Sequence, residues 1–129
     1  MGYNTTKRDY NWSNWNEALD HVWKYERNGS FKIMHNTIAS IDGANNVSIT
    51  LHNTDIYRIN WSHSGSSTIT LDSGGWHSMT TKDRINRFLP LGFRLIQRNW
   101  NWIIQEMEDG TYRDRELFFD GMQIKLELA

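Results

Sequence analysis

Three Asp-Gly dipeptides constrain the fold more than any other feature of this sequence. They are Asp42-Gly43, Asp109-Gly110 and Asp120-Gly121, and each lies between segments in which apolar and polar residues alternate. Asp-Gly favours the tight turn of a β-hairpin, because both residues tolerate a left-handed backbone. A period of two places the apolar side chains on one face of a strand. The pattern therefore predicts antiparallel hairpins with one face on a core.

Two helices interrupt these strands. Apolar residues recur at helical spacing from Trp15 to Trp23, and Asn14 with Glu17 forms a capping-box pattern, which predicts a helix over 14–28. A second apolar stripe predicts a helix over 81–89, capped by Thr80 or Thr81 and ended by Pro90. We expect an α+β fold with about seven or eight short strands over residues 31–128, in a curved antiparallel sheet or partly open barrel.

The length and composition are typical of one domain. The chain has 129 residues and no linker or repeat, so we expect a single domain over 1–129, with residues 1–12 as a loose arm. There are no cysteines, which excludes disulfides and thiolate metal sites. No apolar run has the length of a membrane span, and the first residues lack the apolar stretch of a secretory signal. We expect a protein of a reducing cytoplasm with no membrane contact.

The segment from Ser73 to Arg87 carries the densest set of chemical groups in the chain. Two successive glycines allow a tight turn and close approach of a ligand, and hydroxyl residues then lead into the second predicted helix. The first turn of a helix offers N–H groups and a partial positive charge to an anion. We therefore expect a phosphate or nucleic-acid contact through Gly74, Gly75, Trp76, Thr80, Thr81, Lys82, Arg84 and Arg87.

Charge is distributed unevenly along the chain, whose net charge is −1. Residues 73–98 carry five cations and one carboxylate, whereas residues 101–129 carry three cations and seven carboxylates. A basic patch beside an acidic one can steer an anion to one face. The alternative is purely structural: a turn, a helix cap and two solvated surfaces whose charges cancel.

Histidines could add catalysis to this segment. His77 lies within it, and pairing of strands could bring His52 close to it. Two imidazoles with Thr81 and Arg84 would suffice for metal-free acid–base cleavage of a phosphodiester. The alternative is that each histidine is an ordinary surface or hydrogen-bonded residue, which is the more common role of a single histidine. The sequence contains no His-Glu-x-x-His motif and no Walker spacing around Thr81-Lys82, so we expect no metal and no cofactor.

Tryptophans are frequent, with seven in the chain. Trp76, Trp100 and Trp102 could stack on bases or anchor the core. Five Asn-Trp dipeptides recur, and no mechanism for them follows from the sequence alone; they begin at Asn11, Asn14, Asn60, Asn99 and Asn101.

Four stretches resemble segments of small proteins encoded by tailed bacteriophages. They are Ile69–Trp76, Thr80–Asn86, Leu51–Ile56 and Phe119–Ile124, and the resemblance spans residues 37–124. It implies a phage product that acts in the cytoplasm of the bacterial host. It also favours a binding role over catalysis, because small accessory phage proteins often modulate host nucleic-acid enzymes or defence systems.

Three functions follow as hypotheses. The first is binding of nucleic acid, or of a host protein that handles it, through residues 73–87. The second is a metal-free nuclease or other phosphate-ester enzyme. The third is an acidic inhibitor in which residues 106–120 imitate nucleic-acid charge. Unpaired sheet edges could also join two copies into a homodimer.

Overall fold

We describe the protein from a computed structural model that places residues 9–62 and 65–127. Residues 1–8 of the expected arm and residue 128 of the expected last strand lie outside the described residues. The described chain forms two helices and nine strands, and the α+β fold with an N-terminal and a mid-chain helix is confirmed. No helix in this part of the chain combines the length and the apolar character needed to cross a bilayer.

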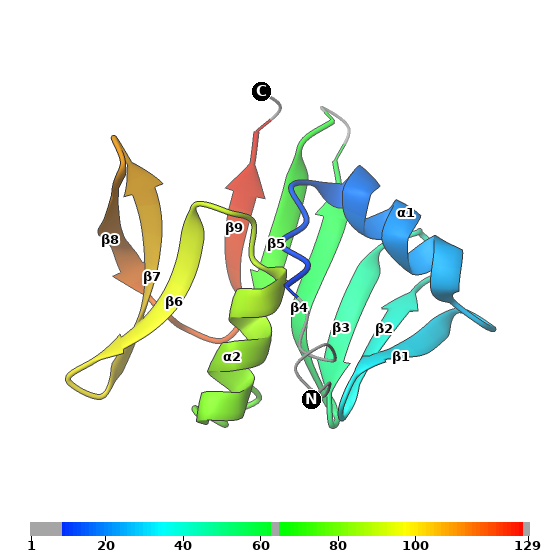
Figure 1. Cartoon of the computed structure of the whole chain (residues 1–129), viewed down its shortest axis with the longest axis horizontal. Helices are drawn as coiled ribbons and strands as arrows, with labels where there is room; N and C mark the ends of the chain where they lie inside the picture. The colour runs from blue at the N-terminus through cyan, green and yellow to red at the C-terminus, as the bar shows by residue number, and fades with distance from the viewer. Residues whose placement is uncertain (1–8, 63–64, 128–129) are drawn as a thin grey trace, which may run out of the picture.

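The strands form two antiparallel sheets rather than one barrel (Figure 1). The larger sheet has the order β1-β2-β3-β4-β5-β9, in which β1 is Ser30–Met34, β2 is Thr37–Ile41, β3 is Val47–Leu51, β4 is Thr54–Trp61, β5 is Ser67–Leu71 and β9 is Met122–Leu126. The smaller sheet contains β6 (Phe93–Arg98), β7 (Asn101–Glu108) and β8 (Thr111–Leu117) in that order.

The spacing of Phe31, Ile33, Ile38 and Ile41 predicts one strand over residues 31–41, but this stretch forms a hairpin, and the described chain has nine strands. The alternation between residues 31 and 41 is broken at Asn36, whose φ of 55° turns the chain between β1 and β2. Asp120-Gly121, in contrast, is not the hairpin turn that the sequence predicted. It leads from β8 in the small sheet to β9 in the large one, where Ile124 pairs with Ile69 of β5.

The helices begin and end close to where the sequence placed them. Helix α1 covers Trp15–Tyr25, and the Asn14 side chain accepts a hydrogen bond from the Glu17 N–H as the capping pattern predicted. It ends before residue 28, because Glu26 is already extended and Asn28 and Gly29 turn the chain into β1. Helix α2 covers Met79–Phe88, and its cap is Ser78 rather than Thr80 or Thr81.

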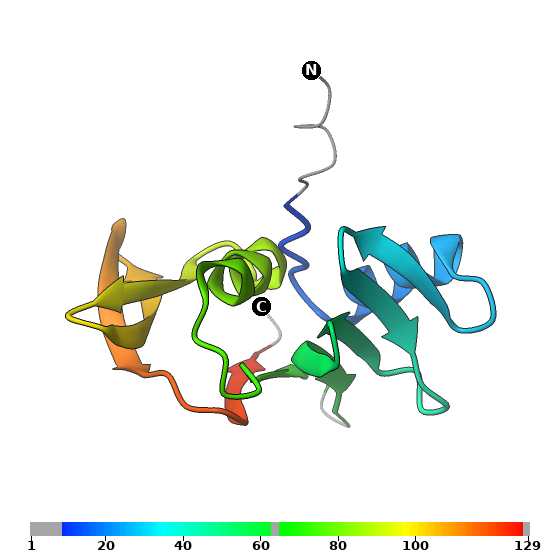
Figure 2. The same ribbon diagram turned by 90° about the horizontal axis from the view of Figure 1, so that it is seen from below.

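Both helices lie against the sheets. Helix α1 contacts β1 to β4, whereas α2 contacts β4 of the large sheet and β6 of the small one. Figure 2 shows α2 between the two sheets, so the helix joins them. Its Phe88 is fully buried and packs on Tyr57, with ring centroids 5.7 Å apart.

Residues just before α1 belong to the core. Trp12 is 2 % exposed, and the Tyr10 ring stacks on Phe88 with centroids 5.3 Å apart. The N–H groups of Tyr10 and Asn11 both donate to the carbonyl oxygen of Arg87. Residues 10–12 are therefore fixed in the core and do not form the loose arm that the polar sequence predicted.

Candidate functional site

The Ser73-Gly74-Gly75 turn is anchored to the loop between β8 and β9. Ser73 is buried, and both its N–H and its hydroxyl donate to Asp120 Oδ1, at 2.8 and 2.7 Å. Burial alone would raise the pKa of Asp120, but the hydrogen bonds from Ser73, with smaller contributions from Gly75 and His77, outweigh it, so the pKa lies below its ordinary value. The ionised carboxylate therefore holds the turn in place.

Glycine is required at position 74. Its φ is +63°, and a Cβ atom there would overlap the Thr54 hydroxyl at the start of β4. A close approach with a left-handed backbone is open to glycine alone. Gly74 thus brings the turn against β4, whereas Gly75 has open space around its Cα.

The beginning of α2 lies directly after this turn. Ser78 Oγ accepts from the Thr81 N–H at 3.1 Å and contacts Thr81 Oγ1 at 3.0 Å. Thr81 is buried at 4 % exposure, whereas Thr80 is exposed. The first N–H groups of a helix have no intrahelical acceptor; here Ser78 Oγ takes the Thr81 N–H, and the Ser78 carbonyl oxygen accepts from the Lys82 N–H.

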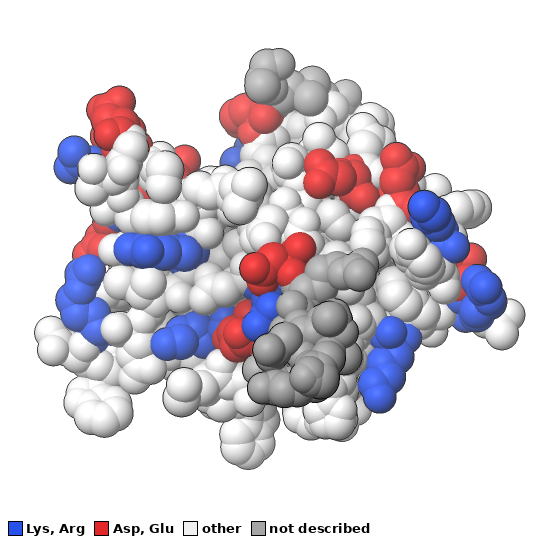
Figure 3. All heavy atoms as spheres, in the orientation of Figure 1, with Lys and Arg blue, Asp and Glu red and all other residues white. Residues whose placement is uncertain are grey.

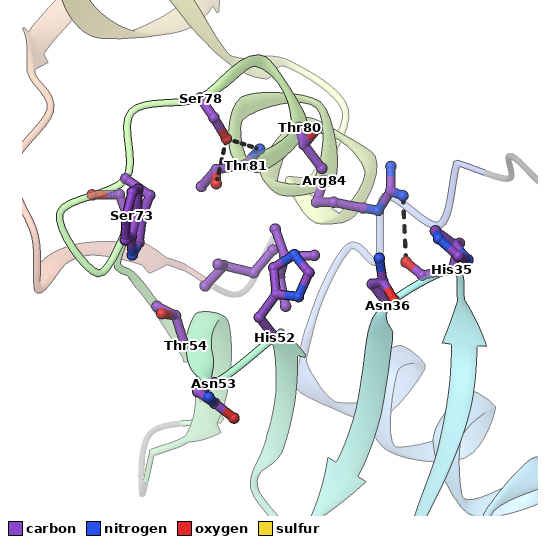
Figure 4. A pocket seen from close by; sticks show the side chains of 13 residues that line it. His35, Asn36, His52, Asn53, Thr54, Ser73, Ser78, Thr80, Thr81 and Arg84 are labelled. Carbon is purple, nitrogen blue, oxygen red and sulfur yellow. Dashed lines mark hydrogen bonds between the residues drawn. The ribbon is translucent and has the colours of Figure 1, made fainter.

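A cavity of about 620 Å³ opens at this helix start (Figure 4). We call it the α2 pocket. Three parts of the chain line it: the turn between β1 and β2, the end of β3 with the start of β4, and residues 73–84. The lining residues are His35, Asn36, Leu51, His52, Asn53, Thr54, Ile56, Ser73, Trp76, Ser78, Thr80, Thr81 and Arg84.

Arg84 is the cation of the α2 pocket. Its guanidinium donates to Thr37 Oγ1 at 3.2 Å and to the His35 carbonyl oxygen at 3.4 Å, and it pairs with Asp83 at 2.8 Å. Its side chain is only 12 % exposed. A guanidinium has five N–H donors, so these contacts fix its orientation and still leave donors for an anion.

The other cations of the segment lie elsewhere. Arg87 pairs with Asp83 at 3.0 Å and with Asp9 at 3.1 Å, and Lys82 is half-buried; neither lines the α2 pocket. Burial would raise the pKa of Asp83, but the two arginines lower it below its ordinary value. On the face shown in Figure 3, cationic and acidic side chains are interspersed. Of the five cations of residues 73–98, Arg84, Arg87 and Arg98 are paired with carboxylates.

The histidines separate into two places. His52 lies in the β3–β4 turn with a φ of 56°, and it lines the α2 pocket together with Thr81 and Arg84. His77 does not line it. The His77 ring stacks on Trp102, with centroids 4.4 Å apart and planes 16° from parallel. The structure thus brings together three of the four proposed catalytic residues and places His77 against the small sheet.

The sequence interpretation named His52 of the β3–β4 turn but missed the β1–β2 turn as part of the site. A signal was present, because His35-Asn36 and His52-Asn53 are the same dipeptide at corresponding positions. In an antiparallel meander, alternate turns lie at the same end of the sheet. The expected single strand over residues 31–41 concealed the first of these turns.

The three tryptophans differ in environment. Trp76 is 73 % exposed and lines the α2 pocket. Trp102 is buried in the core, whereas Trp100 lies in the β6–β7 turn and is 89 % exposed. Trp76 therefore combines exposure with a position on the candidate site.

Several carboxylates of the acidic stretch 106–120 form ion pairs. Arginines of the small sheet contact its carboxylates in the pairs Arg98–Asp114, Arg113–Glu108 and Arg115–Glu106. Its negative charge is thus partly compensated within the sheet. Among the described residues, no group of three or more histidine and carboxylate side chains is arranged to hold a metal ion.

Comparison with known proteins identifies the family. A family model described as Kyanoviridae Gp96 protein matches residues 5–125, which include both helices and nearly all of both sheets. No curated protein and no solved structure matches the chain.

Proposed function

The chain belongs to the Kyanoviridae Gp96 protein family and is thus a tailed-bacteriophage protein; from that premise we propose that it binds single-stranded nucleic acid in the α2 pocket, within the host cytoplasm. The phage origin that the sequence resemblance implied is confirmed at the level of the family. The observation that carries the proposal is the meeting of Trp76 and Arg84 at one cavity in front of a helix start.

A phosphate group finds complementary groups on the α2 side of the pocket. Arg84 supplies fixed guanidinium donors, and hydrogen bonds between a guanidinium and a phosphate are among the strong ones. Ser78 and Thr80, at the start of the helix, line the same cavity and add hydroxyl groups to it. Together they form a compact anion site with one cation.

A base finds a stacking surface at Trp76. Aromatic side chains stack on bases of any sequence, and removal of one such contact costs about 1–3 kcal/mol per base. A cavity of about 620 Å³ is within the ordinary size range of ligand sites and accommodates a nucleotide. Since Trp76 is largely exposed, the neighbouring nucleotides can continue into solvent.

The neutralised surface sets the expected salt dependence. Arg84 is the cation that lines the pocket, and Arg87 is held by Asp83 and Asp9. When a protein binds a single strand, a plot of log affinity against log salt concentration has a slope of about −0.7 for each phosphate that the protein neutralises. We expect the shallow slope that neutralisation of about one or two phosphates gives. We also expect Arg87→Ala to lose little affinity for the strand.

Fluorescence anisotropy with labelled RNA and DNA strands of ~12 nucleotides tests this function. Trp76→Ala and Arg84→Ala are expected to weaken binding about tenfold each, because each removes roughly 1.4 kcal/mol or more. Trp100→Ala is the matched control, since Trp100 is exposed but outside the pocket. Equal affinities of Trp76→Ala and the unaltered protein would contradict the proposal, and no binding of either strand would indicate a host protein as the partner.

A second candidate function is metal-free RNA cleavage. It is favoured by His35 and His52, the two histidines that line the α2 pocket. The imidazole of either His35 or His52 would accept the proton of the 2′-hydroxyl while the oxygen of that hydroxyl bonds to phosphorus. The other would protonate the departing 5′-oxygen as its bond to phosphorus breaks. This function predicts cleavage of RNA but not of DNA in EDTA, and loss of cleavage in His52→Ala. His77→Phe, outside the pocket, serves as the control; intact RNA after prolonged incubation would exclude the reaction.

A further inference from the structure

A second cavity lies at the opposite end of the large sheet. Its volume is about 410 Å³, and it is lined by Trp15, Ala44, Asn45, Asn46, Asn60, Trp61 and Ser62. Asn46 precedes β3 and Trp61 ends β4, whereas the α2 pocket lies where β3 ends and β4 begins. The two cavities are therefore separated by the length of these strands.

We propose that this second cavity, which we call the Asn-Trp pocket, binds a neutral saccharide. Two of the recurring Asn-Trp dipeptides supply its aromatic residues, Trp15 and Trp61. Their ring centroids are 6.1 Å apart with planes tilted by 45°. Indole rings present a large apolar face, which matches the C–H face of a pyranose ring. The site is independent of nucleic-acid binding at the α2 pocket.

The Trp15 ring is held in place by its polar edge. Its indole N–H donates to the Asn45 carbonyl oxygen at 2.7 Å, and its backbone N–H donates to Ser67 Oγ at 2.8 Å. These two bonds fix the half-buried ring where it lines the cavity. Trp61 is 48 % exposed, so part of its surface is accessible beside the cavity.

Two asparagine amides are oriented by an ion pair next to the cavity. Asn46 Nδ2 donates to Asp42 Oδ2 at 3.4 Å, which leaves the Asn46 Oδ1 as an acceptor for a ligand. Asn60 Oδ1 accepts from Arg58 Nε at 3.2 Å, which leaves its amide N–H groups as donors. Arg58 and Asp42 are paired at 2.8 Å. One fixed acceptor and one fixed donor suit a sugar hydroxyl, which both donates and accepts.

The lining also selects against charged ligands. None of the described residues that line this cavity carries a charge. A phosphate or carboxylate would lose hydration here without gaining an ion pair, and that desolvation is costly. Apolar ring faces with a few fixed polar groups are typical of sites for small neutral ligands.

A titration of ¹⁵N-labelled protein with neutral sugars tests the inference. The sugars are glucose, galactose, mannose, rhamnose and N-acetylglucosamine with their disaccharides, up to ~50 mM to detect millimolar affinity. At least one is expected to give saturable shifts of the Trp15 and Trp61 indole N–H and of the Asn46 and Asn60 side-chain amides. Trp76 at the α2 pocket is expected to remain unshifted.

Two variants distinguish a specific sugar site from incidental contact between sugar and protein surface. Trp61→Ala is expected to reduce the affinity at least tenfold, as is Asn60→Asp, which replaces the amide donor by a carboxylate. Trp100→Ala is the control and is expected to bind as the unaltered protein does. The inference is overturned if no sugar shifts these resonances, or if the same shifts persist in both Trp61→Ala and Asn60→Asp.

Discussion

A single hydroxyl in the core is a source of instability. Tyr57 is fully buried and packs against Trp12 and Phe88, but its hydroxyl has no hydrogen-bond partner among the described residues. Burial raises the pKa of this hydroxyl above its ordinary value. An unsatisfied buried polar group costs about 1–3 kcal/mol, so this residue opposes folding through its oxygen and favours it through its ring.

We expect Tyr57→Phe to stabilise the protein. The substitution keeps the ring and removes the unsatisfied hydroxyl, so the free energy of unfolding should rise by about 1 kcal/mol. Urea unfolding at neutral pH measures this change. A loss of more than about 0.5 kcal/mol would show that the hydroxyl has a favourable partner.

Gly74→Ala tests the close approach of the turn to β4. The added Cβ would overlap Thr54 at a backbone φ of +63°. We expect a loss of about 1–3 kcal/mol in stability, together with weaker binding in the α2 pocket. Gly75→Ala is the control, because it has a positive φ but open space. Thr54→Ala should partly rescue Gly74→Ala, and the absence of any rescue would contradict the steric account.

Asp120 predicts a loss of stability in acid. Its pKa is lowered in the folded protein from the ordinary 3.8, so its contribution is complete above that value and is lost as the pH falls through the lowered one. Urea unfolding at pH 7, 5 and 3 is expected to show less acid sensitivity in Asp120→Asn than in the unaltered protein. An identical pH dependence of the two proteins would exclude the role that we assign to this carboxylate.

At the scale of the element, one side-chain amide connects α2 to β6. The Asn86 side chain donates to the Leu95 carbonyl oxygen at 2.9 Å and accepts from the Leu95 N–H at 2.7 Å. These two bonds join the last turn of α2 to β6.

We expect Asn86→Ala to lower the free energy of unfolding by about 1–3 kcal/mol, because it leaves two backbone groups of β6 without their partner. Thermal and urea unfolding measure the loss. Asn16→Ala, on the exposed face of α1, is the matched control and should change stability by less than about 0.5 kcal/mol. Similar losses in both variants would argue against a specific connection.

Elements whose signals are local could be predicted from the sequence. The Asn14 cap, the hairpin turn at Asp109-Gly110 and the two-residue periodicity of the strands are such signals, and all are observed. Asp120-Gly121 misled the prediction, because β9 pairs with β5, which is distant along the chain. Tyr10 and Trp12 were missed for the same reason: their burial depends on Phe88, and polar neighbours hide it from a local pattern.

The candidate site shows the same division. The Gly-Gly turn, the exposed Trp76 and the approximate start of α2 follow from residues adjacent in sequence. The pairing of Arg87 with Asp9 and the contribution of His35 do not, because they require the tertiary arrangement. Charge summed along the sequence therefore overstated the basic character of residues 73–87.

For the whole molecule, the two proposed binding sites lie at opposite ends of the large sheet. The α2 pocket contains a cation and a helix start, whereas the described lining of the Asn-Trp pocket is uncharged. The small sheet and α2 are joined through the core, so the α2 pocket depends on the assembled fold rather than on residues 73–87 alone.

The most direct test of the central claim is chemical-shift mapping of the labelled protein with a short mixed-sequence RNA and DNA, first at low and then at moderate salt. We expect shifts at His52, Gly74, Gly75, the Trp76 indole and Thr80 that weaken with added salt, and little change at Trp61. No shift at these residues, or shifts confined to other surfaces, would contradict nucleic-acid binding in the α2 pocket.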